Sequence, residues 1–245
     1  MRLLIDAGNT RMKWQLLARG KVLEKGFARL EEGGNFHELA PWNASIERIV
    51  ISTVIAEERR RQLKSRLEAT FSAPVIFHWA ESRRGKLVNA YSDVSRMGAD
   101  RWHAMCGGWQ ATGAGGFAVV DAGSAITVDY VARSGAHLGG YILPGKEMML
   151  RSLRQDAARI GFDILDAEQA SPGTSTTECV HHGLVWLREA MVTRIHRDCR
   201  HFGLDRVLVT GGDASGLIGA GLSAVHEPYL VLSGLAAVDG GWVPE

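Results

Sequence analysis

The sequence predicts an α/β protein made of two similar halves with a cleft between them. Three observations support this prediction: a strand–turn–strand segment occurs twice, glycines stand in pairs beside short apolar runs, and short strands alternate with amphipathic helices. The 245 residues are 46% hydrophobic and 22% charged, a composition typical of a globular protein with a sizeable core. The 29 glycines, against 6 prolines, indicate tight turns and close backbone approach to a ligand.

The duplicated segment marks the start of each half. Leu3–Leu17 reads as a short apolar run, the turn residues Asp6-Ala7-Gly8 and a second strand-like run. Phe117–Thr127 repeats this plan with Asp121-Ala122-Gly123, 115 positions later. Two copies with the same internal order favour a duplicated hairpin over a chance pair of turns.

The rest of the chain reads as alternating strands and helices. Leu63, Leu67 and Phe71 recur every four residues, as one buried face of a helix requires. Further strands are expected at Ile46–Thr53, Val75–Trp79 and Val207–Thr210, and further helices at Asp100–Gln110, Met148–Ile160, Val180–Cys199 and Ala214–Leu222. No Pro-rich or Ser-rich linker separates the halves, so we place their boundary near Gly113–Gly116. This predicts an N-terminal half over residues 1–114 and a C-terminal half over residues 115–245.

The residues of the two turns point to phosphate binding. Glycine lets backbone N–H groups approach an anion, and Asn9, Thr10 and Ser124 offer short hydrogen-bond donors. Lys13 supplies a positive charge for phosphate oxygens. A carboxylate repels phosphate, so the two turn aspartates are expected to act through a cation or a bound water. The Thr210-Gly211-Gly212-Asp213 turn is a third candidate for contact with a nucleotide ring or phosphate.

Charge and cysteine content limit the function classes. The 28 basic and 27 acidic residues give a net charge of +1, so no global field attracts nucleic acid or anionic lipid, and only a local patch could do so. Arg59-Arg60-Arg61 is interleaved with glutamates and reads as a solvated helix face. No apolar run approaches the roughly 18 residues of a membrane span. Three widely spaced cysteines suit a reducing compartment. We expect a cytoplasmic protein with no nucleic-acid or membrane partner.

Two further stretches carry candidate chemistry. Asp100 and Arg101 stand side by side after a small turn, where they serve either as helix-start and ion-pair residues or as a proton acceptor and an anion clamp. Ser175 and Glu178 fit a capping box at the start of a helix. Thr176 then falls in the first helical turn, a ready anion site, although capping alone also explains these hydroxyls.

Taken in order, five segments resemble the type III pantothenate kinase family of the sugar-kinase and actin-like ATPase superfamily. They are Asp6–Lys13, Gly98–Arg101, Asp121–Thr127, Gly139–Gly145 and Thr210–Asp213. The resemblance covers essentially the whole chain, and the Gly-Ala-Asp-Arg and Gly-Gly-Tyr-Ile-Leu-Pro-Gly segments make it specific. It implies two ribonuclease-H-like (actin-like ATPase) halves and ATP-dependent phosphorylation of pantothenate to 4′-phosphopantothenate, the first step of coenzyme A biosynthesis, by a cytoplasmic homodimer.

The resemblance also implies the roles of individual residues. Asp100 is expected to be the catalytic proton acceptor, and Asp121 to hold a monovalent cation, K⁺ or NH₄⁺, beside the Mg²⁺ that accompanies ATP. Expected ATP contacts are Asp6, Ala7, Gly8, Asn9, Thr10, Arg11, Met12, Lys13 and Ser124. Expected pantothenate contacts are Tyr91, Gly98, Ala99, Asp100, Arg101 and Thr176.

Two positions and two alternatives qualify this assignment. The family usually has Thr where this chain has Ser124, which keeps the hydroxyl and loses a methyl group. Thr174 and Thr177 compete with Thr176 for the substrate contact. The alternative functions are another small-molecule kinase of the superfamily and a transcriptional accessory factor, as some relatives were first described. The apolar face of Val180–Cys199 is either a dimer surface or core.

Overall fold

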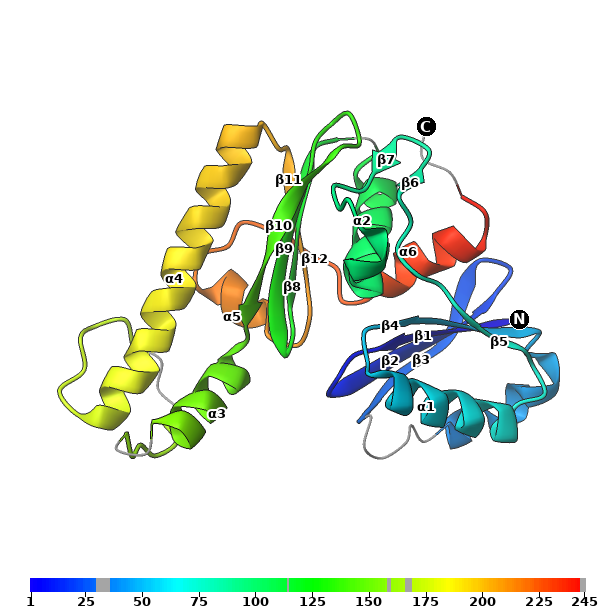
Figure 1. Cartoon of the computed structure of the whole chain (residues 1–245), viewed down its shortest axis with the longest axis horizontal. Coiled ribbons are helices and arrows are strands. Elements are labelled where there is room, and N and C mark those ends of the chain that lie inside the picture. Colours follow the sequence, from blue (N-terminus) through cyan, green and yellow to red (C-terminus); the bar gives the residue numbers. More distant parts are fainter. Residues whose placement is uncertain (30–35, 114, 158–159, 166–168, 243–245) are drawn as a thin grey trace. The chain divides into compact units, whose positions relative to one another are not determined.

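The computed structural model describes the chain except residues 30–35, 114, 158–159, 166–168 and 243–245. It divides into two compact units (Figure 1). The first contains Met1–Ala114, Ser134–Gly139 and Tyr229–Glu245, and the second contains Gly115–Arg133 and Gly140–Pro228. Among the described residues, no helix is long and apolar enough to cross a membrane.

The first unit is built on a five-stranded sheet with the order β3-β2-β1-β4-β5. β1 pairs antiparallel with β2 and parallel with β4. The strands are β1 Arg2–Ala7, β2 Arg11–Ala18, β3 Lys21–Arg29, β4 Arg48–Thr53 and β5 Val75–Phe77, with a small β6 Arg83–Arg84 and β7 Leu87–Val88 ladder outside the sheet. The helices are α1 Glu57–Thr70, α2 Ala99–Thr112 and α6 Leu230–Asp239, with 3₁₀ segments η1 His37–Ser45 and η2 Val94–Arg96.

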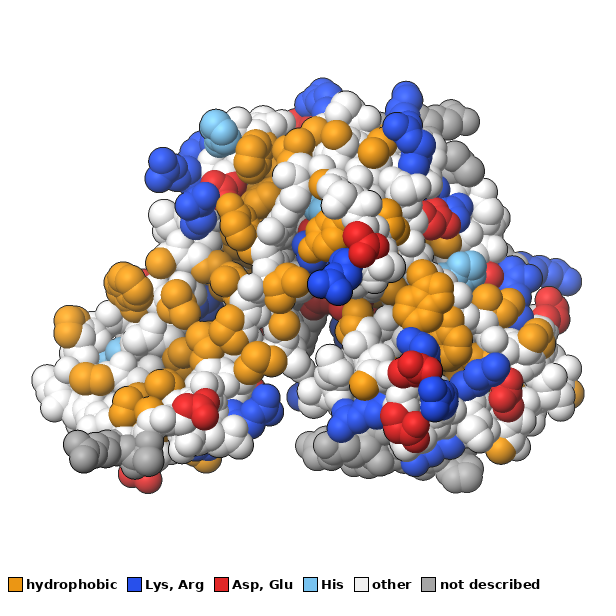
Figure 2. Space-filling model, viewed as in Figure 1, with side chains coloured by type: hydrophobic (Ala, Val, Ile, Leu, Met, Phe, Trp, Pro, Cys, Tyr) orange, Lys and Arg blue, Asp and Glu red, His pale blue; other side chains and the backbone are white. Residues whose placement is uncertain are grey.

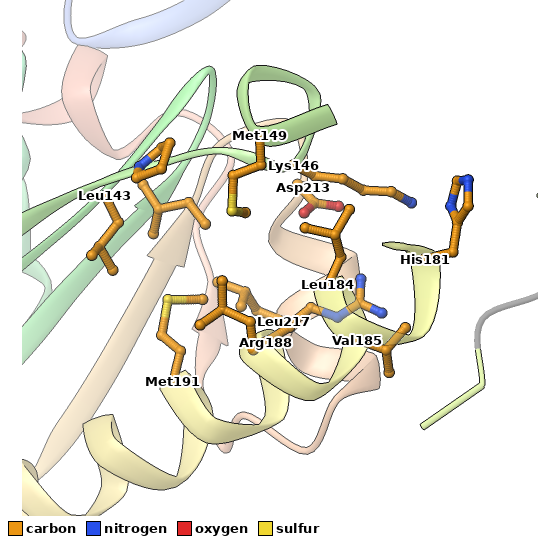
Figure 3. Close-up of a pocket in the computed structure, with 13 residues that line it drawn as sticks. Leu143, Lys146, Met149, His181, Leu184, Val185, Arg188, Met191, Asp213 and Leu217 are labelled. Atoms are coloured by element: carbon orange, nitrogen blue, oxygen red, sulfur yellow. The ribbon is translucent and has the colours of Figure 1, made fainter. Parts of the chain in front are cut away.

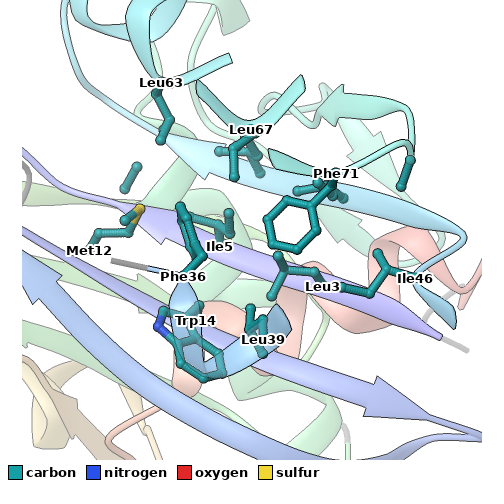
Figure 4. Close-up of a cluster of buried hydrophobic side chains, with 14 of the residues drawn as sticks. Leu3, Ile5, Met12, Trp14, Phe36, Leu39, Ile46, Leu63, Leu67 and Phe71 are labelled. Carbon is teal, nitrogen blue, oxygen red and sulfur yellow. The ribbon is translucent and has the colours of Figure 1, made fainter. Parts of the chain in front are cut away.

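Alternation along β1 and β4 sends side chains to two differently covered faces. Leu3 and Ile5 pack against Leu63 and Leu67 of α1, together with Phe71 directly after that helix, as Figure 4 shows. The intervening side chains, Leu4 on β1 and Val50 on β4, pack against Leu232 and Leu235 of α6. The expected spacing of Leu63, Leu67 and Phe71 on one buried face is confirmed.

The last helix returns to the first sheet through an ion-pair cluster. Asp239, at the end of α6, accepts hydrogen bonds from Arg2 Nη1 at 2.7 Å and from Arg48 Nη2 at 2.9 Å. These arginines lie on the neighbouring strands β1 and β4, so one carboxylate joins α6 to both. Together with the apolar packing of α6, this contact joins the C-terminal segment to the first compact unit.

The second unit repeats the strand order of the first. Its sheet has the order β10-β9-β8-β11-β12, with β8 antiparallel to β9 and parallel to β11. The strands are β8 Phe117–Ala122, β9 Ala125–Val131, β10 His137–Pro144, β11 Arg206–Thr210 and β12 Val225–His226; the helices are α3 Lys146–Asp156, α4 Thr176–Phe202 and α5 Ala214–Gly219. α4 and α5 cover one face of this sheet. The predicted α/β class with two similar sheets is confirmed.

Most element boundaries differ from the predicted ones by a few residues. The largest shifts concern α4, which begins four residues before Val180 and ends three after Cys199, and α3, which begins at Lys146 and ends at Asp156. Ser175 sets the start of α4, because its Oγ accepts the N–H of Glu178 at 3.2 Å. The Glu178 carboxylate reaches back to the N–H of Thr174 at 2.7 Å, one residue before the cap, a variant of the predicted capping box.

Candidate active site

The first glycine turn joins β1 to β2 and is hydrogen-bonded to the end of β4. Gly8 donates its N–H to the carbonyl of Arg11 at 3.0 Å, which closes a tight turn with Asn9 and Thr10 exposed at its tip. Thr53 Oγ1 donates to the carbonyl of Ala7 at 2.9 Å and fixes the turn to the end of β4. The side chains of Ala7 and Met12 are fully buried, so their expected contacts with ATP fall to backbone groups.

A row of polar residues crosses the sheet beside this turn. Asp6 on β1 is paired in register with Lys13 on β2 and with Ser52 on β4. Side chains of paired residues project from the same face of a sheet, so these three form one row. The row lies on the face that α6 covers, since Leu4 and Val50 precede Asp6 and Ser52 by two residues.

The second glycine turn repeats this arrangement with one residue fewer. Gly123 donates to the carbonyl of Ala125 at 3.0 Å, which leaves only the exposed Ser124 at the tip. Asp121 is paired with Thr127 on β9 and with Thr210 on β11. Thr127 therefore takes the place of Lys13, and Thr210 the place of Ser52. The two rows therefore differ at one position, where the first has the ammonium group of Lys13 and the second has the hydroxyl of Thr127.

Close backbone packing holds the second turn in place. Gly211 has φ +95°, and a Cβ there would collide with the backbone of Ala122. Asp213 donates its N–H to the carbonyl of Ala122 at 2.9 Å, and Gly145 donates to the carbonyl of Ser124 at 3.0 Å. The glycine-rich turn after β11 is thus seated directly on the end of β8.

Asp100 and Arg101 begin helix α2 in the first unit. Asp100 Oδ1 accepts the N–H of Arg101 at 2.7 Å and lies over Gly98, where an added Cβ would stand 2.6 Å from that oxygen. A carboxylate in the first turn of a helix is stabilised by the helix dipole. Gly98 and Ala99 let the chain pass beneath it without a bulky side chain.

Arg101 is held by an aromatic pair. Its side chain is buried, with 5% of its surface exposed, and its Nη1 donates to the hydroxyl of Tyr91 at 2.8 Å. The ring of Tyr91 stacks on His137, with centroids 6.4 Å apart and planes 11° from parallel. Tyr91 also donates its N–H to Asn89 Oδ1 at 3.0 Å. The guanidinium is therefore preorganised, as a fork that binds a carboxylate must be.

Thr176 is the first residue of α4 in the second unit and is exposed. The competing hydroxyls are engaged: Thr174 Oγ1 donates to Glu178 Oε2 at 2.8 Å, and Thr177 Oγ1 accepts the N–H of Asp163 at 3.2 Å. The hydrogen bonds of Glu178 to the Thr174 backbone and side chain lower the pKa of its carboxyl group. The helix start is thus anionic beside Thr176.

A cavity of about 100 Å³ opens in the second unit beside the turn after β11 (Figure 3). Its walls are mainly apolar side chains from α4, α5 and the end of β10, among them Leu143, Leu184 and Leu217. Lys146, Arg188 and Asp213 add charge at the same place. Asp213 Oδ1 and Arg188 Nη1 both lie over Gly216, where a Cβ would stand 2.6 Å and 2.9 Å from them. An apolar cavity with a few charged groups is typical of a small-molecule site.

Comparison with known proteins identifies the family. Residues 2–198 match the family model described as type III pantothenate kinase. A type III pantothenate kinase of Marinobacter nauticus is 54% identical over 243 residues, covering 99% of this chain and 100% of the relative. That of Hahella chejuensis is 33% identical over 240 residues, covering 96% and 95%. This chain belongs to the type III pantothenate kinase family.

Solved structures agree on the fold of this family member. A Baf family protein from Campylobacter jejuni superposes with a TM-score of 0.59 at 20% identity, covering 97% of this chain and 98% of its own. Component A of (R)-2-hydroxyglutaryl-CoA dehydratase from Acidaminococcus fermentans gives a TM-score of 0.53 at 14% identity, covering 98% of both chains. The expected actin-like ATPase fold is confirmed. The full-length relatives named as kinases favour the kinase over the accessory factor.

Several residues that lie beside the candidate site residues were not predicted from the sequence. Ser52 and Thr53 end β4, His137 supports Tyr91, and His103 lies on α2. The duplicated turn could have revealed Ser52, because it occupies the place of Thr210 at the end of the corresponding strand. The two histidines had no signal in the sequence, since their partners are distant along the chain.

Proposed function

We propose that this chain phosphorylates pantothenate at the expense of ATP through the residues described above, with Asp100 as the proton acceptor. The observation that supports these roles best is the start of α2, where the Asp100 carboxylate accepts the backbone N–H of Arg101, whose buried side chain is hydrogen-bonded to Tyr91. Membership of the kinase family supplies the substrates, ATP and pantothenate.

The acceptor side of the reaction uses Asp100 and Arg101. Asp100 takes the proton from the hydroxyl of pantothenate as its oxygen attacks the terminal phosphorus of ATP. Arg101, together with Tyr91, binds the pantothenate carboxylate and orients the chain of the substrate. Gly98 and Ala99 leave room for it, and the exposed hydroxyl of Thr176 supplies a further contact.

The donor side uses the two glycine turns. Asp6–Lys13 and Ser124 bind the phosphates through backbone N–H groups, short hydroxyl or amide donors and the Lys13 ammonium. The apolar cavity beside Gly211–Asp213 is suited to the flat nucleobase.

The carboxylate of Asp6 fits an Mg²⁺ ion that arrives bound to the nucleotide. No group of three or more His, Cys, Asp or Glu lies together in the described part of the chain. Mg²⁺ in kinases is bound mainly by phosphate oxygens with one or two carboxylates, so Asp6 would hold it directly or through water. When bound, the ion neutralises charge on the transferred phosphoryl group.

Asp121 fits a monovalent cation such as K⁺ or NH₄⁺. Its row partners Thr127 and Thr210 place hydroxyl-bearing residues on either side of one carboxylate. Such a set of hard oxygen donors with a single negative charge matches a cation of single charge.

We also propose a cytoplasmic homodimer. The three cysteines are unpaired, as a reducing compartment requires. Large apolar side chains stand exposed on β10 and α4 of the second unit, where Ile142 is 63% and Trp186 65% exposed. Figure 2 shows hydrophobic side chains over the visible face of the second unit. A second copy of the chain is the occupant that a cytoplasmic kinase of this family implies for such a patch.

A coupled ADP-release assay tests the proposal. Purified protein receives ATP and Mg²⁺, with and without pantothenate, first in potassium and then in sodium buffer. We expect ADP release to require pantothenate and to be faster in potassium. Folded protein that releases no pantothenate-dependent ADP would contradict the proposed function, and a panel of sugars and acetate would then identify a different acceptor. Equal rates in the two buffers would contradict the cation role alone.

A further inference from the structure

Helix α2 carries a histidine that the reaction itself does not use. His103 follows Asp100 by three residues, is fully buried, and has Nδ1 2.7 Å from Ser52 Oγ. In the described part of the structure its Nε2 has no hydrogen-bond partner. Burial, with smaller effects of His78 and Arg84, lowers the pKa of His103 to about 3, so the imidazole is neutral near pH 7.

Ser52 connects this histidine to the phosphate-binding turn. It is paired in register with Asp6, and their side chains project from the same face of the sheet. The next residue, Thr53, donates to the carbonyl of Ala7 within the turn. Val54 then approaches the start of α2, since a Cβ on Gly98 would lie 3.4 Å from Val54 Cγ1. The end of β4 thus contacts both the turn and the helix start.

Helix α6 packs closely against α2 at the same residue. A Cβ on Gly234 would collide with the carbonyl oxygen of His103, and one on Gly107 would lie 2.5 Å from the carbonyl of Leu230. The two helices therefore touch backbone to backbone at His103. While α6 contacts the backbone of α2 at this residue, the His103–Ser52 hydrogen bond fixes the distance of α2 from β4.

We propose that His103 and Ser52 are positioning residues, which hold Asp100 in line with the phosphate-binding turn. This inference rests on the proposed function. An apolar pair would fill the same space without the cost of burying an imidazole, so packing alone does not require these side chains. A directional hydrogen bond specifies one separation of helix and strand, and transfer between two bound substrates depends on such alignment.

The test compares His103→Leu, Ser52→Ala and the double variant with His103→Asn, whose amide can still bond to Ser52. Cys106→Ala is the matched control, because Cys106 is buried one turn further along α2. Calorimetric titration with pantothenate counts the binding-competent sites, and kcat is expressed per competent site. This removes any loss that is due only to unfolded protein.

We expect His103→Leu and Ser52→Ala to lower kcat ~10-fold or more, because misplacement by about 1 Å can cost 10²-fold. The KM values should change little, since each substrate keeps its own contacts. The double variant should be no worse than the poorer single variant, and His103→Asn should recover most of the rate. Cys106→Ala should retain kcat.

Two results would overturn the assignment, and they are distinguishable. If the wild type is active and His103→Leu keeps the full kcat, whatever the melting temperature of the variant, the positioning role alone is overturned. An equal loss of kcat in Cys106→Ala would likewise reduce His103 to an ordinary core residue. Wild-type protein without pantothenate-dependent turnover would overturn the proposed function and this inference with it.

Discussion

Asp100 is a charged residue in the first turn of α2, directly before Arg101. Replacing it by Asn keeps an oxygen that can accept the N–H of Arg101, so the helix start and the Arg101–Tyr91 contact should persist. The proton acceptor is lost, and a general base contributes ~10²–10⁴-fold. We expect Asp100→Asn to lower kcat by that factor with little change in the KM of pantothenate, measured by ADP release.

Asp93 offers a control for Asp100 nearby in the sequence. It caps the 3₁₀ segment η2 through Ser95, is exposed, and has no role in the proposed chemistry. Asp93→Asn should retain the wild-type rate. Wild-type turnover in Asp100→Asn would remove Asp100 from the mechanism.

Asp121 should govern the response to potassium. Its carboxylate is the one negative charge in the row with Thr127 and Thr210, so Asp121→Ala removes the charge that attracts the cation. We expect the potassium titration of the rate to flatten in this variant and to persist in Asp156→Ala, a change at an exposed acid on α3. A potassium dependence that is unchanged in Asp121→Ala would exclude the proposed cation site.

At the scale of elements, the contact between α2 and α6 depends on glycine. Gly234→Ala inserts a methyl group into the backbone of His103, so the helices must separate. We expect a loss of roughly 1–3 kcal/mol in the free energy of unfolding, the usual cost of overpacking, together with reduced kcat. Urea unfolding followed by tryptophan fluorescence measures the first, because Trp102 and Trp109 on α2 report on this unit.

Gly183 provides the opposite case on α4. It is helical and nothing lies within 4 Å of an added Cβ. Gly183→Ala should therefore stabilise the protein by about 0.5–1 kcal/mol. Equal effects of the two substitutions would mean that helix propensity, rather than the close approach of α2 to α6, sets the outcome at Gly234.

The elements that could be predicted are those whose signals are local. The two hairpins, the helix with Leu63 and Leu67, and the cap at Ser175 all follow from neighbours a few residues apart. The single-residue difference between the two turns was not predictable, because strand register decides that Thr127 rather than Val128 pairs with Asp121. Ser52 and His103 lie 51 residues apart, and only packing brings them together.

At the scale of the whole molecule, the sequence predicts the repeat but not the long-range returns of the chain. The duplicated order of the sheets follows from the repeat, but the chain does not divide into two continuous segments. Ser134–Gly139 and Tyr229–Glu245 belong to the first compact unit. His137 reaches Tyr91 in this way, and Asp239 reaches Arg2 and Arg48. Such returns depend on tertiary contacts that composition and periodicity do not reveal.

Stability of the molecule should fall in mild acid because of His103. The unfolded chain binds a proton near the usual His pKa of 6.5, whereas the folded chain resists protonation down to about pH 3. The contribution of neutral His103 to the free energy of unfolding is therefore fully present above pH 6.5. It is lost as the pH falls toward 3, by up to ~1.4 kcal/mol per pH unit. We expect the urea midpoint to fall more steeply between pH 6.5 and 4.5 in the wild type than in His103→Asn.

The chosen pH range keeps the half-buried Asp239 ionised. Burial raises the pKa of Asp239, but the hydrogen bonds from Arg48 and Arg2 outweigh this effect and leave the pKa below its usual 3.8. Its contribution is therefore lost only below that pH. His226→Asn, at an exposed position, controls for the loss of a histidine. Parallel pH profiles of the wild type and His103→Asn would contradict the prediction.

Assembly of two chains should depend on the exposed apolar side chains of the second unit. α4 buries Val192 and Ile195 against its own sheet, while Trp186 stays 65% exposed. In a two-fold symmetric dimer each such residue is used twice, and burying one large apolar side chain contributes about 1.5–3 kcal/mol. Trp186→Glu should therefore convert a dimer into a monomer in sedimentation experiments. Phe27→Glu, at an exposed position on β3 of the first unit, should leave the dimer intact. If the wild type is a monomer, or if Trp186→Glu remains a dimer, the surface around Trp186 is not the dimer interface.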